Sequence, residues 1–346
     1  MKAAFLKSHG GPEVIEYGEL PGSDVKGPQP KAREVVVRVA FGALNHLDVW
    51  VRKGLPFLKL SYPHVLGGDA AGVVEKVGSE VTRVKVGDEV IVHPGLSCGG
   101  CEACLSGWET LCPSYKILGE HVSGTHAERV AVPEVNLFPK PSGISFEEAA
   151  SIALVFTTAW QMVVRRANVQ PGERVLVHGA GSGVSTAAIQ IAKLYGATVF
   201  VTSGSDEKLE AARRLGADGL LNYRKVDFAT EIKKLVPKGV DIVLDHIGQD
   251  FWEKNIRCLK WGGRLVTCGA TSGHAAVTDL RHLFFRQLSL LGSTMGSKAD
   301  FPRILGLIAD GRLKAVVDKV FPLSEAAEAH RYLERQSQFG KVLVRP

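Results

Sequence analysis

Long apolar runs are missing from this sequence. No stretch is long enough to cross a bilayer, and the N-terminal segment MKAAFLKSHGG lacks the apolar centre of a signal peptide. Long runs of lysine and arginine are also missing, so nucleic acid is an unfavoured partner although the formal net charge is +6. These absences argue against a membrane-spanning protein and predict a cytoplasmic location.

Cysteine is scarce, yet most of it is clustered. Six cysteines occur in 346 residues, and four of them fall in the segment SCGGCEACLSGWETLC at residues 97–112. A reducing compartment disfavours disulfides, so the four should be thiolates on a metal. Four thiolates form a closed tetrahedral site without a position for substrate, which predicts a structural rather than a catalytic metal. The predicted ligands are Cys98, Cys101, Cys104 and Cys112.

Length and pattern divide the chain into two domains. A chain of 346 residues is too long for one compact core. Residues 1–150 have the pattern of short strands and turns, with no long helical pattern. Residues 145–167 are helical in pattern, with Ser145 as a plausible N-cap. From Glu173 strands and helices alternate, which predicts an α/β fold with a doubly wound parallel sheet.

A glycine-rich turn joins the first strand and helix of this alternating region. In VLVHGAGSGVSTAAIQIAKLYGA the glycines would let the backbone approach a pyrophosphate at the helix N-terminus. A strict G-x-G-x-x-G pattern would need glycine at 184, but the strand before and the helix after favour a dinucleotide site over a packing turn. The residues predicted to bind are Gly179, Gly181, Ser182, Gly183 and Val184.

The tip of the second strand indicates which dinucleotide binds. An acidic residue at this tip usually holds the ribose 2′-OH of NAD, but here the tip is Ser203. Ser203 and Ser205 can donate to a 2′-phosphate and Lys208 can supply charge, so NADP is predicted over NAD, which stays possible. Lys208 could equally be a solvated helix residue. Tyr223 could cover the adenine or the phosphate, or only pack.

Five motifs in order resemble one superfamily. The segments NHLDVWVRKG, GGDAAGVVEKVG, VKVGDEVIV, GVSTAAIQIAKLYGA and GKVLVRP are similar to the medium-chain dehydrogenase/reductases. The resemblance implies a GroES-like catalytic domain at 1–155 and 291–346, with the zinc lobe at about 95–115. It implies a Rossmann nucleotide-binding domain at 156–290, NAD(P)-dependent oxidoreductase activity on a small molecule, and a homodimer or homotetramer.

This superfamily contains zinc alcohol dehydrogenases and zinc-free quinone oxidoreductases, and the chain combines features of both. Its cysteine cluster is similar to the structural zinc lobe of the alcohol dehydrogenases. The three positions that hold their catalytic zinc ligands carry Asn45, Gly68 and Leu154, which cannot bind zinc tightly. Asn45 and Asp48 instead match the N-x-x-D pattern of the quinone oxidoreductases.

These replacements predict direct hydride transfer from NADPH to a quinone or an α,β-unsaturated carbonyl, since such acceptors need little polarisation. Asn45 is the candidate donor near the nicotinamide or the carbonyl, or an amide that only fixes a turn. Asp48 is expected to orient Arg52 or a loop rather than to act as an acid. Trp50 could form an apolar wall for a flat substrate, or only pack.

Further cofactor neighbours follow from the resemblance and from the sheet. The threonine in TTAW resembles the family threonine beside the nicotinamide ring, which is Thr158 here. Ligands of doubly wound sheets bind outside the carboxyl ends of the strands, which adds Ile247, Gly269 and Ser293.

Two alternatives stay open. One is a zinc alcohol dehydrogenase with atypical ligands, in which a catalytic metal is rebuilt from nearby histidine and aspartate: His46, His64, His93, Asp48 and Asp69. The other is a nucleotide-binding protein without turnover. Zinc content separates the first alternative from a zinc-free reaction, and a screen of acceptors separates the second.

Overall fold

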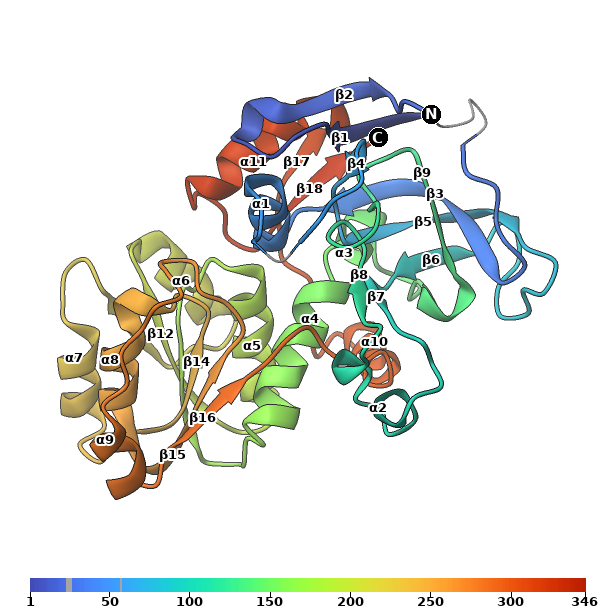
Figure 1. The fold of residues 1–346 in the computed structure, drawn as a ribbon. Helices are drawn as coiled ribbons and strands as arrows, with labels where there is room; N and C mark the ends of the chain where they lie inside the picture. Colours follow the sequence, from blue (N-terminus) through green and yellow to red (C-terminus); the bar gives the residue numbers. More distant parts are fainter. Residues whose placement is uncertain (23–26, 57) are drawn as a thin grey trace. The chain divides into compact units, whose positions relative to one another are not determined.

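The computed structural model describes residues 1–22, 27–56 and 58–346. The chain forms two compact units, Met1–Leu154 with Ser297–Pro346 and Val155–Gly296 (Figure 1). The predicted fold class is confirmed, because one unit is a GroES-like β structure and the other an α/β structure with a parallel sheet. The sequence predicted that the C-terminal part of the first domain begins at residue 291. That residue lies within strand β16 (Ser289–Gly292), which belongs to the parallel sheet of the second unit.

The first unit is built on a seven-stranded sheet in the order β10-β6-β5-β3-β18-β17, with β9 paired to β3. The C-terminal strand β18 pairs antiparallel with β3, so both ends of the chain contribute to one sheet. Its core is rich in β-branched residues, such as Val35, Val37 and Val74. The strands are β3 (Glu34–Ala43), β5 (Asp69–Val77), β6 (Glu89–Val92), β9 (Arg129–Pro133), β10 (Leu137–Pro139), β17 (Val317–Pro322) and β18 (Lys341–Arg345).

Smaller elements complete this unit. One small sheet has three strands in the order β2 (Ile15–Glu19), β1 (Lys2–Leu6) and β4 (His64–Val65). A second small sheet pairs β7 (Gly95–Leu96) with β8 (Lys116–Ile117). The helices are α1 (His46–Lys53), α2 (Glu102–Leu105), α3 (Phe146–Ala150), α10 (Phe301–Ala309) and α11 (Ala326–Glu334). The short 3-10 turns are η1 (Pro12–Val14), η2 (Glu109–Leu111), η3 (Glu134–Asn136) and η5 (Leu323–Glu325).

The continuous helical pattern at 145–167 is divided in the structure. Ser145 caps α3 as predicted, because its Oγ atom accepts from Glu148 N at 3.1 Å and Glu148 accepts from Ser145 N at 2.8 Å. Helix α3 then ends, α4 (Ala153–Trp160) begins, and α4 passes into a π-helix, η4 (Gln161–Arg166). The apolar periodicity continues through the break, which is why sequence alone did not reveal it.

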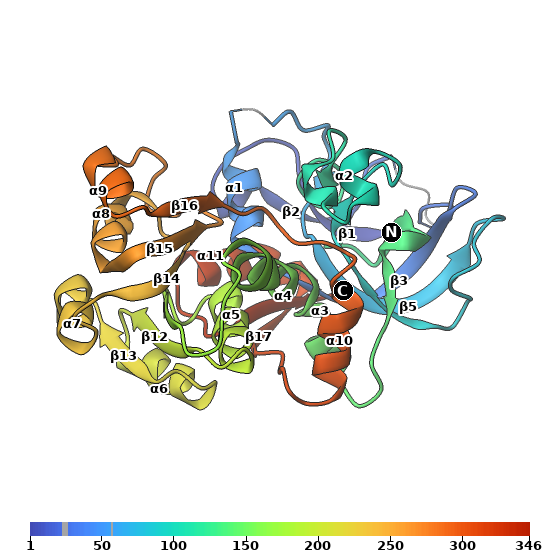
Figure 2. The same cartoon turned by 90° about the horizontal axis from the view of Figure 1, so that it is seen from below.

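The second unit has a six-stranded parallel sheet in the order β13-β12-β11-β14-β15-β16 (Figure 2). Figure 1 shows α7 and α8 on one face of this sheet and α5 on the other. The strands are β11 (Arg174–Val177), β12 (Thr198–Ser203), β13 (Gly219–Asn222), β14 (Val240–Asp245), β15 (Leu259–Thr267) and β16. The helices are α5 (Gly183–Leu194), α6 (Asp206–Arg214), α7 (Phe228–Leu235), α8 (Gln249–Cys258) and α9 (Leu280–Phe285).

One helix end differs from its prediction. The pattern DFWEKNIRCLKWGG predicted a helix closed by the two glycines, but α8 ends at Cys258 and the glycines lie within β15. Within the described ranges, no helix has the length and apolar character needed to span a membrane.

Candidate active site and zinc lobe

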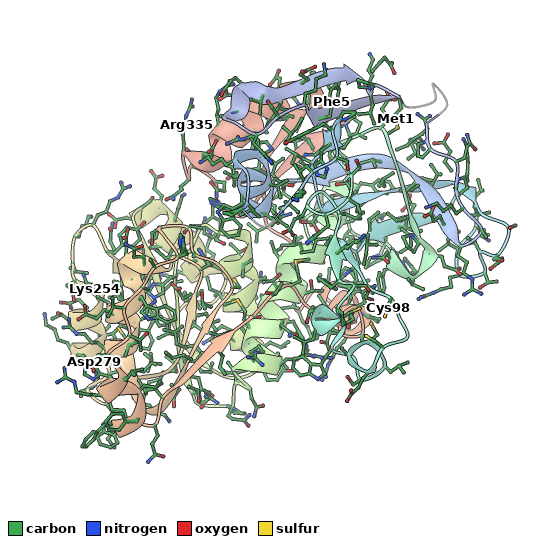
Figure 3. The ribbon with its side chains drawn as sticks, in the orientation of Figure 1. Met1, Phe5, Cys98, Lys254, Asp279 and Arg335 are labelled. Atoms are coloured by element: carbon green, nitrogen blue, oxygen red, sulfur yellow. The ribbon has the colours of Figure 1, made fainter. Side chains whose placement is uncertain are left out.

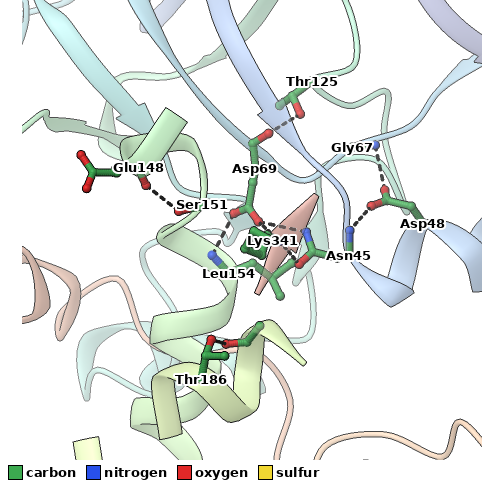
Figure 4. A network of polar contacts seen from close by, with 11 residues as sticks. Asn45, Asp48, Gly67, Asp69, Thr125, Glu148, Ser151, Leu154, Thr186 and Lys341 are labelled. Atoms are coloured by element: carbon green, nitrogen blue, oxygen red, sulfur yellow. Dashed lines mark hydrogen bonds and ion pairs between the residues drawn. The ribbon is translucent and has the colours of Figure 1, made fainter. Parts of the chain in front are cut away.

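Asp69, the first residue of β5, is the centre of a buried polar network (Figure 4). Its Oδ2 atom accepts from Lys341 Nζ at 3.1 Å and from Asn45 Nδ2 at 2.9 Å, and its Oδ1 atom accepts from Leu154 N at 2.8 Å. Lys341 also donates to Asn45 Oδ1 at 2.5 Å. The three side chains are at most 7 % exposed. Removing either charged partner would therefore leave an uncompensated buried charge.

Strand pairing brings this network together from distant parts of the sequence. Ala43, the last residue of β3, pairs with Asp69 on one side and with Leu343 of β18 on the other. Asn45 follows β3 directly, and Lys341 begins β18. Three neighbouring strands therefore present the amide, the carboxylate and the ammonium group to one another.

Asp48 holds the loop beside this network. Its carboxylate accepts from Asn45 N at 2.7 Å and from Gly67 N at 2.9 Å, and burial raises the pKa of Asp48 to about 6. Neither contact involves Arg52, whose guanidinium donates instead to Gly10 O and to Glu334. Of the two roles expected for Asp48, its described contacts are those to the loop and not to Arg52.

Glu120 is a buried acid that the sequence reasoning missed. Burial, and then the charge of Asp48, raise the pKa of Glu120 to about 7. Its position after Gly119 in a turn gave no pattern from which this environment could have been predicted. Trp50 lies on α1, two residues after Asp48, and its ring packs edge-on against His46 with centroids 5.0 Å apart.

The residues at the three positions of catalytic zinc ligands are brought together but do not fit a zinc ion. A Cβ atom on Gly68 would lie 3.6 Å from Leu154 Cδ1, and Leu154 N and Asn45 both bind the Asp69 carboxylate. Glycine and leucine offer no side-chain donor. Asn45 Oδ1 faces the ammonium group of Lys341, which would repel a divalent cation at this distance.

The histidines offered for a rebuilt zinc site do not converge. His64 Nε2 contacts Gly119 O at 2.9 Å, and His93 Nδ1 accepts from Gly95 N at 3.2 Å. Burial lowers the pKa of His93 to about 3, so its ring is neutral. Among the residues that the structure describes, the cysteine cluster is the one group of three or more such ligands close enough for a metal.

The four cysteines of the zinc lobe, of which Cys98 is labelled in Figure 3, do fit a zinc ion. Their sulfur atoms all lie within 4.8 Å of one another, and the measured separations include 3.5 Å for Cys98–Cys112 and 3.5 Å for Cys101–Cys104. Tetrahedral Zn–S bonds of about 2.3 Å place sulfurs roughly 3.8 Å apart. Amides of Gly100 and Cys101 donate to Cys98 and lower the pKa of its thiol to about 6, which favours the thiolate.

The lobe is tied to the segment that follows the second unit. The buried Glu109 carboxylate accepts from Ser297 Oγ at 2.7 Å and from the Lys298 backbone amide. The Lys298 side chain in turn donates to Gly95 O at 2.9 Å. These contacts join the lobe to the start of the C-terminal part of its own unit.

The glycine-rich turn between β11 and α5 has the backbone of a phosphate site. Gly179 has a φ of +63°, and a Cβ atom there would lie 2.9 Å from His246 Cε1, so both conformation and space require glycine. The first-turn amides of α5 have no partner within the helix and can face an anion. The turn and the start of α5 contain the residues predicted here: Gly179, Gly181, Ser182, Gly183 and Val184.

The predicted serines lie at the tip of β12 and the start of α6. Ser203 ends β12, and its Oγ atom accepts from Ser205 N at 3.2 Å. Ser205 is the N-cap of α6, and its Oγ atom accepts from Lys208 N at 3.4 Å. Both hydroxyls keep their hydrogens available to donate to a ligand.

Arg224 is a cation that the sequence reasoning missed at this tip. A Cβ atom on Gly204 would lie 2.9 Å from Tyr223 Oη and 2.9 Å from Arg224 Nε, so both side chains cover the tip. The nearby carboxylate of Asp206 is bound by Lys225 at 2.5 Å. The place of Arg224 directly after Tyr223 was the signal that could have identified it.

The remaining predicted neighbours lie at or after strand ends. Ile247 N donates to Asp245 Oδ1 at 3.1 Å after β14, and Ser293 N donates to Thr267 O at 2.9 Å after β16. Ser293 Oγ is buried without a hydrogen-bond partner in the described part of the chain, which a bound ligand would satisfy. Gly269 follows β15 and accepts from Thr267 Oγ1, while the buried Thr158 lies on α4.

Known proteins resemble the chain over its full length. The alcohol dehydrogenase GroES-like domain matches residues 31–142, and the zinc-binding dehydrogenase family matches residues 183–310. An NAD-dependent alcohol dehydrogenase of Sulfurisphaera tokodaii is 33% identical over 96% of this chain and 99% of its own. The human quinone oxidoreductase is 30% identical over 99% of this chain and 97% of its own. A crystal structure of an NAD-dependent alcohol dehydrogenase is 52% identical, with a TM-score of 0.95 and full coverage of both chains.

Fold, glycine-rich turn and relatives together define an NAD(P)-dependent oxidoreductase. The chain belongs to the medium-chain dehydrogenase/reductase superfamily, in which its relatives are alcohol dehydrogenases and quinone oxidoreductases. The resemblance expected from the sequence is therefore confirmed. The four-cysteine cluster supports a structural zinc in this family member.

Proposed function

We propose that this enzyme transfers a hydride from NADPH to a quinone or an α,β-unsaturated carbonyl without a catalytic zinc ion. The observation that carries the proposal is the buried network of Asn45, Asp69 and Lys341, which occupies the place where zinc ligands are expected. The side-chain oxygen atoms of Asn45 and Asp69 that could bind zinc already accept hydrogen bonds, and the ammonium group of Lys341 opposes a second cation.

The chain's own residues suit an acceptor that is already electron-poor. NADPH, when bound, supplies the hydride and its electron pair. The reduced carbonyl or quinone oxygen then takes negative charge and needs a donor. The amide of Asn45 has a second N–H beyond the one given to Asp69, and this group can donate to that oxygen. A proton from water completes the reduction, and Trp50 offers a flat apolar face for a ring.

NADPH is favoured over NADH by the charges at the tip of β12. The tip residue is Ser203 rather than an acid, and the guanidinium of Arg224 lies against Gly204. A guanidinium can donate two parallel hydrogen bonds to the negatively charged oxygens of a 2′-phosphate. Lys208, at the start of α6, adds a second positive group nearby in sequence.

A chelation experiment tests the zinc-free mechanism. Purified enzyme should contain about one zinc per chain by elemental analysis, which is the content of the cysteine cluster alone. Brief treatment with a chelator at moderate temperature should leave oxidation of NADPH by a panel of quinones and enones nearly unchanged. Two zinc ions per chain, with turnover that chelation abolishes and added zinc restores without refolding, would overturn the proposal.

Alcohol oxidation is the second candidate function, because the 52% identical structure is that of an NAD-dependent alcohol dehydrogenase. The same preparations should be tested with alcohols and either NAD or NADP. Faster alcohol oxidation than enone or quinone reduction would favour this candidate. Binding of NADPH without turnover of any acceptor or alcohol would instead favour a nucleotide-binding protein.

We also propose that the enzyme is a homodimer. Strand β16 is an outer strand of the parallel sheet, with no second partner among the described strands. The preceding helix α9 exposes large apolar side chains, including Leu280, Phe284 and Phe285, each at least 64 % exposed. An unpaired strand beside an apolar surface is suited to pairing with a second copy.

A further inference from the structure

A basic hollow lies in the second unit, away from the glycine-rich turn. It has a volume of about 970 Å³ and lies among the end of α7, the end of α8, the start of β15 and α9. The hollow lies at the end of the sheet where its parallel strands begin. Dinucleotides bind outside the carboxyl ends of such strands, so the hollow and the dinucleotide site lie at opposite ends of the strands. Its basic residues are Lys233, Lys234, Lys238, Arg257, Lys260 and Arg286.

The positive charge of this hollow is only partly compensated. Three of its cations have carboxylate partners outside the lining: Lys234 with Glu231, Lys260 with Asp241, and Arg257 with Glu253 at the long distance of 4.0 Å. No carboxylate belongs to the described residues that line it. The C-terminal ends of α7 and α8 contribute roughly half a negative charge each. About two positive charges therefore stay unbalanced.

The uncompensated cations are Lys233, Lys238 and Arg286. Neither lysine side chain forms a hydrogen bond or an ion pair within the described part of the chain. Arg286 donates to the carbonyl oxygens of Ile256 and Leu259, which hold its guanidinium in place without neutralising it. Burial, and then the charge of Arg286, lower the pKa of Lys233, as expected where two cations face each other. An anion would relieve this repulsion.

An irregularity of β15 turns an aromatic ring outward beside these cations. Leu259 pairs with Val240 and Arg264 pairs with Ile242, so the four residues 260–263 stand opposite the single residue Asp241 and the segment bulges from the sheet. Gly262 makes this possible with a φ of +71°. The bulge leaves Trp261, which lines the hollow, 66 % exposed. An indole in this position offers a flat face for stacking.

We propose that the basic hollow is a second ligand site, separate from the dinucleotide site, and that it binds a nucleoside polyphosphate. The phosphates bind Lys233, Lys238 and Arg286, and the base stacks on Trp261. The three uncompensated cations come from different segments of the lining and can contact more than one phosphate group, which favours a di- or triphosphate over a single phosphate ester. This site is independent of the acceptor reduced at the active site.

Calorimetric titration of the NADPH-saturated enzyme with ATP tests this site, because the dinucleotide site is then filled. We expect saturable binding that weakens by about tenfold or more in the double variant Lys233→Glu, Lys238→Glu, since hydrogen bonds to charged groups are lost. The matched control Lys31→Glu, Lys85→Glu makes the same change in net charge on the other unit. It should alter ATP affinity by less than about twofold.

A second variant separates stacking from charge. Trp261→Ala should weaken ATP by about fivefold or more and leave inorganic triphosphate nearly unchanged, because triphosphate has no base to stack. Unaltered NADPH affinity shows that each variant is folded. The proposal is overturned if ATP gives no saturable binding, or if the control loses as much affinity as the double variant. A single-stranded RNA oligonucleotide that binds these residues about a hundredfold more tightly than ATP would also overturn it.

Discussion

At the scale of single residues, Arg224 gives the tip of β12 a counter-charge for a 2′-phosphate. We expect Arg224→Ser to raise the KM for NADPH by about tenfold and to change the KM for NADH by less than about twofold, because only NADPH carries that phosphate. Initial rates with a fixed quinone measure both values. Arg213→Ser, an exposed position on α6 that pairs with Glu210, is the control. Equal increases for the two cofactors would contradict the assignment.

The residue types in the sequence predicted that the catalytic zinc ligands are missing. They did not predict which contacts are made in their place. Asn45, Gly68 and Leu154 could be recognised as poor ligands from their chemistry alone. Lys341 could not be placed beside Asp69, because that contact needs the pairing of β18 with β3 across 272 residues of sequence. Arg224 differs from Lys341, because it directly follows Tyr223, a predicted neighbour of this tip, and its position could have been inferred from that.

At the scale of elements, the zinc lobe should stabilise the fold without taking part in the chemistry. Cys101→Ser removes one of four thiolates, so zinc content and melting temperature should fall, the latter by more than about 5 °C. The turnover number of the enzyme that stays folded should be nearly unchanged. Zinc analysis, thermal unfolding and active-site titration measure these quantities.

A control and a contrary outcome make this prediction specific. Cys258→Ala changes a buried thiol outside the lobe and should keep zinc at about one per chain. If folded Cys101→Ser enzyme binds NADPH normally but no longer transfers hydride, the lobe takes part in the reaction after all.

Elements were predictable where periodicity and end signals agreed. The alternating strands and helices from Glu173 onward follow the expected parallel order, and Ser145 caps its helix. Helix α1 was missed because it has only eight residues, fewer than the window of roughly 11 to 18 residues over which helical periodicity is recognised. The end of α8 was misplaced because Gly262 and Gly263 form a strand bulge rather than a helix stop.

At the scale of the whole molecule, association of two copies should depend on α9. Light scattering after gel filtration should give twice the chain mass of 37.2 kDa for the natural protein. Phe285→Asp should shift the mass toward 37.2 kDa, because a charge in an apolar interface is poorly solvated. Val86→Asp, at an exposed apolar position of the other unit, should leave the mass unchanged. A natural protein that is already monomeric would refute the dimer.

The ion pair between Lys341 and Asp69 has a consequence for synthesis of the chain. A ribosome makes Asp69 long before Lys341, and β18, which carries this lysine, is the last strand. Until β18 emerges, β3 lacks one neighbour and the Asp69 carboxylate lacks its ammonium partner. The N-terminal 154 residues therefore cannot complete their core as a nascent chain, whereas Val155–Gly296 holds its entire sheet within one continuous segment. The middle of this protein can fold as soon as it is synthesised, whereas its N-terminal segment must wait until β18 is available.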